Sequence, residues 1–256
     1  MEIKDAFILG VVEGLTEFLP VSSTGHLILT AHVLGLPHDE FTKSFEIAIQ
    51  LGSILAVVFI YFERFIKDYE TWKRVILAFI PTGLIGFALY KLIKGYLIGN
   101  DLVVVINLFL GGIVLILADR FCERFCYLKD IDELPVKKAP IIGLFQALAV
   151  VPGVSRSGAT IIGGMLMGLS RRSAAEFSFI LAVPTMLMAT AYDLFKTGGQ
   201  FESSQWELLG VGFITAFFTA MVSVKLFLKF LNSHGFTIFG VYRMIVAILY
   251  AAAFLL

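Results

Sequence analysis

Five residues with chemically useful side chains lie close together near the start of the chain: Glu13, Glu17, Ser22, Ser23 and His26. The two glutamates are four positions apart, so on a helix both carboxylates share one face. Like charges on an apolar helix repel, and a divalent ion such as Mg²⁺ is typically held by one or two carboxylates, with water and substrate phosphates. We therefore expect Glu13 and Glu17 to bind a divalent cation, Mg²⁺ or Ca²⁺. A helix at an interface with its glutamates in water is the alternative.

The hydroxyl groups of this first cluster follow a proline. Pro20 ends the preceding helix, and Ser22, Ser23 and Thr24 stand where a second apolar helix begins. One serine is expected to cap that helix, and the free N–H groups of its first turn form a site for an anion. His26 lies three residues after Ser23, which makes a base–nucleophile pair conceivable, although closeness in sequence does not establish a hydrogen bond.

A second cluster has a similar pattern. Ser155, Arg156, Ser157 and Thr160 follow Pro152 at another predicted helix start. An arginine between apolar stretches is costly without an anionic partner, and its planar fork of donors matches phosphate oxygens. A structural ion pair with a glutamate of the first cluster is the alternative. Together the two clusters are typical of phosphoryl-transfer sites, which combine carboxylates for a metal, helix N-termini, hydroxyls and an arginine.

The composition places these clusters in a membrane protein. The chain has 256 residues, 58% of them hydrophobic and 16% charged, with mean hydropathy +0.89. The net charge of zero offers no case for a nucleic-acid partner. Apolar runs, each a little short of the ~20 residues that cross a bilayer, predict six transmembrane helices: Ile47–Phe62, Val75–Tyr90, Leu102–Ala118, Phe177–Tyr192, Leu208–Val224 and about Phe236–Leu256.

The two clusters belong to an internal repeat. Ser22, Thr24 and Gly25 recur at one offset as Ser155, Ser157 and Gly158. The surrounding blocks, 4–36 and 140–168, each contain two apolar segments too short to span, so each is expected to be a re-entrant hairpin. Three spanning helices follow each block, which turns the second copy upside down.

The predicted fold is therefore an all-α integral membrane protein with about six transmembrane helices and two re-entrant helical hairpins in an inverted-topology repeat. It forms one domain, 1–256, with repeat one about 1–120 and repeat two about 139–256. Two loops rich in basic residues are expected to be cytoplasmic, with both termini outside: they contain Arg64, Lys67, Lys73 and Arg74, and Arg120, Arg124, Lys129, Lys137 and Lys138. Between the basic residues of the second loop, Cys122 and Cys126 are expected to be ordinary thiols rather than a metal site.

The stretches Glu13–His26 and Pro152–Thr160 resemble the motifs of the undecaprenyl-diphosphate phosphatase family, also known for bacitracin resistance. Further similarity covers Phe45–Gly52 and Glu176–Pro184. The resemblance implies hydrolysis of undecaprenyl diphosphate at the outer face of the bacterial cytoplasmic (inner) membrane, which recycles the lipid carrier for peptidoglycan and other envelope glycans, and dependence on a divalent cation. It assigns Glu13 and Glu17 to metal or diphosphate handling, Ser23 and His26 to catalysis, and Ser155, Arg156, Ser157 and Thr160 to phosphate binding.

The mechanism that we infer has Ser23 attacking the terminal phosphorus, Arg156 and the helix N-termini holding the developing charge, and His26 handling the proton. A water nucleophile is its rival. A lipid-phosphate transporter or flippase is the second function, since inverted repeats with broken helices are typical of carriers, and a receptor or scaffold the third. The expected partners are a polyprenyl diphosphate and membrane lipids, with a homodimer through Gly83 and Gly86 as a weaker expectation.

Overall fold

The computed structural model describes residues 1–37, 39–92, 101–197 and 202–255. Leu256, the end of the sixth predicted run, lies outside them. Eleven α-helices are present in the described residues: α1 (Ile3–Thr16), α2 (Ser23–Val33), α3 (Glu40–Ile60), α4 (Phe62–Lys67), α5 (Tyr69–Leu92), α6 (Asp101–Phe125), α7 (Ala139–Leu148), α8 (Arg156–Leu166), α9 (Arg171–Thr197), α10 (Ser203–Leu231) and α11 (Thr237–Phe254).

Five of the described helices are long and apolar enough to cross a membrane, namely α3, α6, α9, α10 and α11. The remaining predicted span, Val75–Tyr90, lies within α5, a helix of 24 residues that begins with charged Glu70, Lys73 and Arg74. It is not among the five. The prediction of an all-α multi-pass membrane protein is confirmed.

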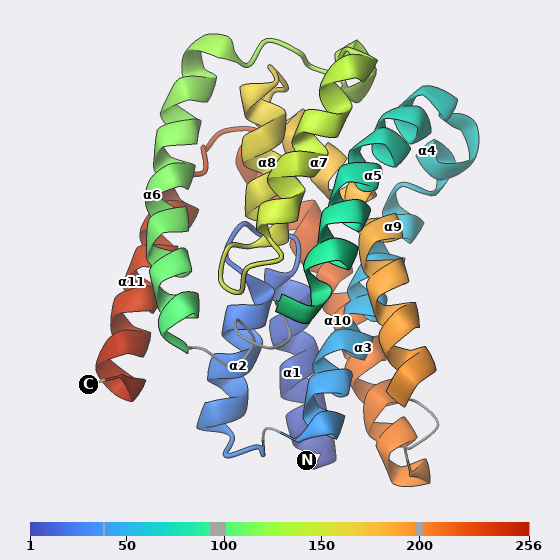
Figure 1. Cartoon of the computed structure of the whole chain (residues 1–256), viewed down its shortest axis with the longest axis vertical. Helices are drawn as coiled ribbons and strands as arrows, with labels where there is room; N and C mark the ends of the chain where they lie inside the picture. The colour runs from blue at the N-terminus through green and yellow to red at the C-terminus, as the bar shows by residue number, and fades with distance from the viewer. Residues whose placement is uncertain (38, 93–100, 198–201, 256) are drawn as a thin grey trace.

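The two blocks around the serine clusters form helical hairpins. Helices α1 and α2 have 14 and 11 residues, and α7 and α8 have 10 and 11, so none approaches the ~20 residues of a membrane span. In Figure 1 the α1–α2 hairpin occupies the lower half of the molecule and the α7–α8 hairpin the upper half, with their turns near the middle. We call the turns 17–22 and 149–155 the first break and the second break.

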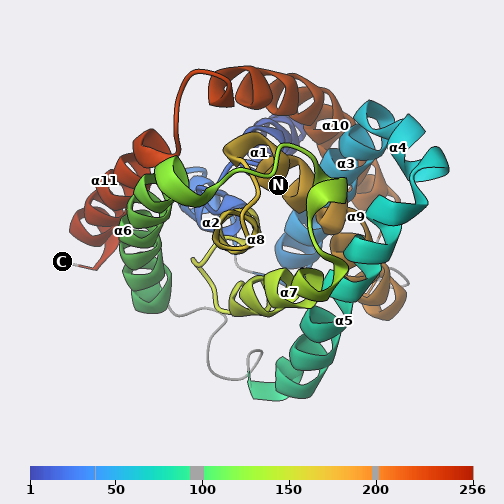
Figure 2. The same ribbon diagram turned by 90° about the horizontal axis from the view of Figure 1, so that it is seen from above.

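The two halves of the chain interlock rather than stand side by side. Helix α1 packs against α10, where an added Cβ at Gly10 would lie 2.6 Å from the carbonyl oxygen of Gly212. Helix α7 packs against α5 in the same way, with Gly143 against the carbonyl of Ala78. Seen from above, α8 and α2 stand near the centre and the long helices surround them (Figure 2). Each hairpin is thus packed against a long helix from the other half of the chain.

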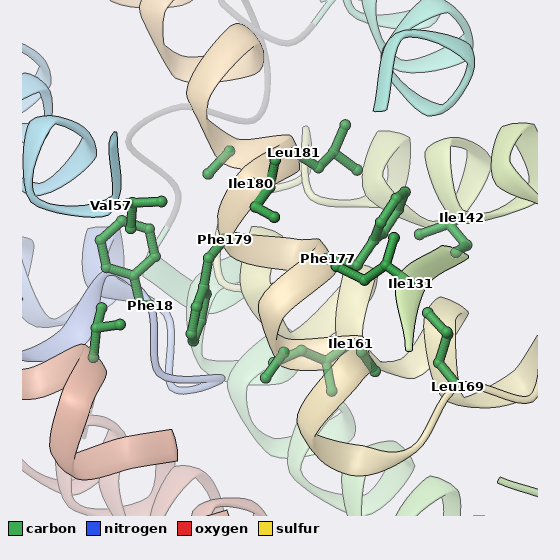
Figure 3. Close-up of a cluster of buried hydrophobic side chains, with 14 of the residues drawn as sticks. Phe18, Val57, Ile131, Ile142, Ile161, Leu169, Phe177, Phe179, Ile180 and Leu181 are labelled. Atoms are coloured by element: carbon green, nitrogen blue, oxygen red, sulfur yellow. The ribbon is translucent and has the colours of Figure 1, made fainter. Parts of the chain in front are cut away.

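One apolar cluster holds the hairpins and long helices together. It extends from Phe18 beside the first break, through Phe179 and Ile161, to Ile131 and Leu169 at the far end (Figure 3). The ring of Phe18 meets that of Phe179 edge to face at 5.2 Å. These residues are almost completely buried, so the first break packs against a dense apolar core.

The prediction for the cysteines is wrong. Cys122 and Cys126 form a disulfide, and Cys122 lies inside α6 rather than in a loop. The apolar run ended at Ala118, but the helix continues through the charged residues to Phe125. Cys126 follows the last helical residue, and its N–H still donates to the carbonyl of Cys122 at 3.2 Å, so the last turn continues and the two cysteines lie on one face.

Candidate active site

Both breaks turn at a serine with an unusual backbone. Ser22 has φ 71° and Ser155 has φ 73°, and they are the two non-glycine residues with positive φ in the described part of the chain. Helix α2 begins at the next residue, Ser23, and α8 begins at Arg156. A positive φ is strained for serine, and such strain is concentrated at functional sites. The equivalence of Ser22 and Ser155 that the repeat predicted is thus visible in the backbone.

Glu17 joins the first residues of the two helices. Its Oε2 accepts a hydrogen bond of 2.5 Å from the Ser23 hydroxyl, and its Oε1 accepts one of 2.8 Å from Arg156 Nη2. The glutamate is only 5% exposed, so the ion pair is largely removed from solvent. Charge-assisted hydrogen bonds of this kind are short and strong. One carboxylate therefore connects the residues that begin α2 and α8.

The guanidinium of Arg156 has further neighbours on α9. Its Nη1 donates to the backbone carbonyl of Ser178 at 3.0 Å, and its Nη2 lies 3.2 Å from the sulfur of Met186. The ring of Phe18 lies 5.7 Å from its central carbon. The Nε is buried and has no hydrogen-bond partner, which leaves one donor for a ligand.

A pocket of about 150 Å³ lies between the two breaks. Both breaks, the starts of α2 and α8, α3 and α9 contribute its lining residues: Glu17, Ser22, Ser23, Thr24, Gln50, Ala149, Val151, Pro152, Gly153, Ser155, Arg156, Ser157 and Met186. Seven of the residues predicted for the site are among them. Gln50 and Met186 also line the pocket, and neither is among the predicted site residues.

The hydroxyls of the second break tie the two hairpins together. Ser155 caps α8, since its Oγ accepts the backbone N–H of Gly158 at 3.1 Å. Ser157 donates to the carbonyl of Leu19 in the first break at 2.7 Å, and its oxygen lies 3.1 Å from that of Ser155. Both serines line the pocket while already serving the fold.

Three predicted site residues lie outside the pocket lining. Glu13 is fully buried, and neither of its carboxylate oxygens has a hydrogen-bond partner. Thr160 is also fully buried, with its hydroxyl 2.6 Å from that of Ser178 on α9. His26 is the third. The clusters therefore divide into groups that face the pocket and groups that lie behind it.

His26 is not hydrogen-bonded to Ser23. Its Nδ1 lies 2.9 Å from the carbonyl oxygen of Ser22, and a carbonyl can only accept, so Nδ1 carries a proton. In the neutral ring Nε2 is then the acceptor, and it receives the Tyr242 hydroxyl at 2.7 Å. The two rings are also stacked. The structure thus gives the histidine a partner on α11, far away in the sequence.

Gln146 stands at the same offset from Glu13 as Ser155 does from Ser22, and it does not line the pocket. Its side chain is buried and donates to the hydroxyls of Thr82 on α5, at 2.9 Å, and Thr185 on α9, at 3.1 Å. Arg243, for which the sequence predicts no role, donates hydrogen bonds to both breaks. The signal in the sequence was a single arginine inside an apolar run.

The donor set fits a divalent cation in one specific way. No group of three or more His, Cys, Asp or Glu side chains that could hold a metal occurs in the described residues. The buried oxygens of Glu13, however, have no other partner, and Glu17 stands one helical turn further along α1. One or two carboxylates, completed by phosphate oxygens and water, are the usual protein ligands of Mg²⁺.

The chain is similar to known proteins over almost its whole length. A family model described as bacitracin resistance protein BacA matches residues 6–249. The undecaprenyl-diphosphatase of Aquifex aeolicus is 67% identical over 250 residues, which cover 98% of either chain. The undecaprenyl-diphosphatase of a Sulfurihydrogenibium species is 55% identical, again over 98% of both chains. That of Thermus thermophilus is 54% identical over 98% of this chain and 97% of its own.

Proposed function

The chain belongs to the bacitracin resistance protein BacA family, and from that premise we propose that it hydrolyses undecaprenyl diphosphate to undecaprenyl phosphate and inorganic phosphate. The product is the lipid carrier that peptidoglycan and other envelope glycans need, and its recycling confers resistance to bacitracin. The observation that carries the proposal is the position of Glu17, which binds both the Ser23 hydroxyl and Arg156. All three line one pocket of a membrane protein.

The geometry supports Glu17 as the group that takes the proton of Ser23. The hydroxyl already donates to Oε2, whereas both ring nitrogens of His26 have other partners. In the step that we propose, Ser23 Oγ attacks the terminal phosphorus as its proton passes to Glu17. The bond from that phosphorus to the bridging oxygen breaks, and undecaprenyl phosphate leaves. Water then attacks the phosphorus of the phosphoserine and the bond from phosphorus to Ser23 Oγ breaks. Glu17 returns its proton to Ser23 Oγ, and inorganic phosphate leaves with the oxygen of the water.

Charge on the transferred phosphoryl group has to be neutralised, and two features serve this purpose. Arg156 can donate from Nε, which has no partner among the described residues, and from Nη2 to two phosphate oxygens. The bond from Nη2 to Glu17 is then replaced by a bond to phosphate. The N-termini of α2 and α8 present backbone N–H groups on either side of the pocket. Direct attack by water on the same phosphorus remains the rival mechanism, and it uses the same charges.

We assign a divalent cation to Glu13 and Glu17, with Mg²⁺ and Ca²⁺ as the candidates. When bound, the ion would neutralise phosphate charge and polarise the phosphoryl group. The support is the pair of partnerless oxygens on Glu13 in a fully buried position. An anionic carboxylate left alone at that depth would be costly.

The placement in the membrane follows from the same elements. Both chain ends lie at the lower end of Figure 1, while α4 and the segment between α6 and α7 are at the upper end and contain five basic residues, Arg64, Lys67, Lys129, Lys137 and Lys138. Basic loops are cytoplasmic by rule, so we propose a protein of the bacterial inner membrane whose pocket serves the outer side. The prenyl chain would lie among membrane lipids. A homodimer through Gly83 and Gly86 stays a proposal; an added Cβ at Gly86 would meet no atom within 4 Å.

The deciding experiment follows phosphate release from a C55 or C15 prenyl diphosphate by the purified chain in detergent. Wild type should turn over, while Ser23→Ala should lose activity and should not become labelled from a terminally ³²P-labelled substrate. Ser233→Ala, at an exposed serine near the far end of α10, is the matched control. If wild type binds the lipid without hydrolysing it, the transporter function is favoured instead. If Ser23→Ala is active, Ser23 is not the nucleophile and water attacks the phosphorus directly.

A further inference from the structure

Arg243 is a fully buried cation of α11 whose position the proposed chemistry does not explain. It is 1% exposed, and all of its hydrogen bonds in the described part of the chain end on backbone carbonyls. The acceptors come from three segments, with distances of 2.9 to 3.3 Å: Asn107 and Leu108 of α6, Pro20 of the first break, and Gly153 and Val154 of the second break.

The acceptors in the two breaks are equivalent positions of the repeat. Pro20 stands two residues before Ser22, and Gly153 stands two residues before Ser155. Nη1 donates to Pro20 at 3.1 Å and Nη2 donates to Gly153 at 2.9 Å. One guanidinium therefore holds the same carbonyl of both turns. It lies where the two halves of the inverted repeat meet.

Broken backbone at membrane depth explains why an arginine is needed there. The carbonyls of Pro20, Gly153 and Val154 lie in the turns before α2 and α8, outside the hydrogen-bond ladder of either helix, and an unpaired carbonyl in an apolar setting costs free energy. A guanidinium points several donors outward in one plane and can satisfy carbonyls on both sides at once, which a lysine ammonium cannot do in the same way. Room for the group comes from Gly111 of α6, where an added Cβ would collide with Nη2.

We propose that Arg243 is a positioning residue that fixes the two breaks relative to each other. Three residues beyond each bound carbonyl stand Ser23 and Arg156, the two groups that meet on Glu17. A shift of one break against the other would move the hydroxyl away from the guanidinium that has to hold the phosphate. This inference deepens the proposed phosphatase function and rests on it.

Arg74 offers a matched control. It is also buried, at 6% exposed, and it donates to the carbonyls of Leu134, Asp132 and Glu70 at 2.7 Å. Those carbonyls belong to α5 and to the segment before α7, and none of them lines the pocket. Arg74→Lys therefore makes the same chemical change in a second buried arginine that holds backbone carbonyls outside the site.

The test compares Arg243→Lys with Arg74→Lys in the full chain in detergent, by melting temperature, by kcat and KM on a prenyl diphosphate, and by hydrogen–deuterium exchange of the backbone. Arg243→Lys should lower kcat on the order of 100-fold, because a displacement near 1 Å has that effect on reacting groups. Exchange should rise in peptides covering 17–25 and 149–158. Arg74→Lys should lower the melting temperature and raise exchange around 130–138, with kcat unchanged.

Several outcomes would overturn the proposal. Wild-type kcat in Arg243→Lys would mean that the charge alone suffices, and a lower kcat without extra exchange in both breaks would mean that Arg243 acts by another route. Should Arg243→Lys fail to fold, Gly111→Ala displaces the guanidinium without removing it, and the same two readouts apply. If wild type does not hydrolyse the lipid, the proposed function fails. The exchange pattern still decides whether Arg243 holds the breaks.

Discussion

The α1–α2 hairpin and the α7–α8 hairpin turn at equivalent serines with nearly identical φ angles, but the next residue differs. Helix α2 begins with Ser23, a neutral hydroxyl, and α8 begins with Arg156, a cation. Glu17 lies in the first break and binds both. The repeat thus supplies one backbone turn twice, and divergence of the side chains makes one copy the candidate nucleophile and the other the anion holder.

A second difference between the hairpins is at Glu13 of α1 and Gln146 of α7, in the helices that precede the breaks. Gln146 of α7 donates to Thr82 and Thr185, whereas Glu13, at the equivalent place of α1, has two buried oxygens without a partner. A neutral amide with satisfied hydrogen bonds holds helices together. A buried carboxylate without a partner is suited to a cation. We infer that the second hairpin is mainly structural at this position and that the first is kept available for a ligand.

Removing the bridge should have the largest effect on activity. Glu17→Gln abolishes the proton acceptor and leaves Arg156 without its anionic partner, so kcat should fall about 1,000-fold, as expected for a lost general base. Phosphate release from the prenyl diphosphate measures it. If Glu17→Gln keeps more than a tenth of wild-type kcat, Glu17 is not the group that accepts the proton of Ser23.

Replacing the cation of the second break should have the next largest effect. Arg156→Lys keeps the charge but loses the planar fork, and kcat should fall about 100-fold, the size expected for one misplaced donor to a transition-state oxyanion. KM should also rise, because the fork helps to bind the ground-state diphosphate. If kcat and KM do not change, the positive charge at position 156 is sufficient and the planar guanidinium is not needed.

Glu13→Gln makes the first hairpin resemble the second. We expect activity to fall about tenfold and to lose its response to added Mg²⁺ or Ca²⁺ and to a chelator, because a neutral amide is a weaker ligand for a hard cation. Titration of the metal in wild type and variant measures the difference. The same chelator response in both proteins would remove Glu13 from the metal site.

Gln146→Leu tests the other half of that comparison. The hydroxyls of Thr82 and Thr185 lose a buried partner, so the free energy of unfolding should fall by about 1–3 kcal/mol. The kcat should stay within about twofold of wild type at temperatures where the protein is folded, as for a side chain remote from the chemistry. Melting temperature and kinetics decide together, and a selective loss of kcat would contradict a structural role.

Tyr242→Phe should have the smallest effect. It removes the hydroxyl that donates to Nε2 of His26 and keeps the stacked ring. If His26 supports the first break rather than transferring the proton, kcat should fall less than about fivefold, since one neutral hydrogen bond contributes about 1 kcal/mol. A loss on the scale of Glu17→Gln would return the proton transfer to His26.

The sequence by itself determined the membrane class, the two hairpins and most of the pocket. Long apolar runs and Pro–Ser breaks are local signals, and hydroxyls at a helix start face the same space whatever surrounds them. The repeat relates Ser22 to Ser155, and residue types and spacing, like the resemblance to a known family, predict Glu17, Ser23 and Arg156. The prediction missed the extension of α6 to Phe125 and the disulfide, because charge marked that helix as a loop.

Only the tertiary structure decided which groups are partners. Glu17 meets Arg156 across 139 positions, and Arg243 reaches Pro20 across 223. No periodicity encodes such distances, because they depend on how α1 packs against α10 and how α11 stands beside both breaks. The same packing brings the Tyr242 hydroxyl to His26, whereas Ser23, only three residues away in the sequence, is hydrogen-bonded to Glu17. On a helix, spacing determines the face of a side chain, but the neighbouring helix determines what it touches.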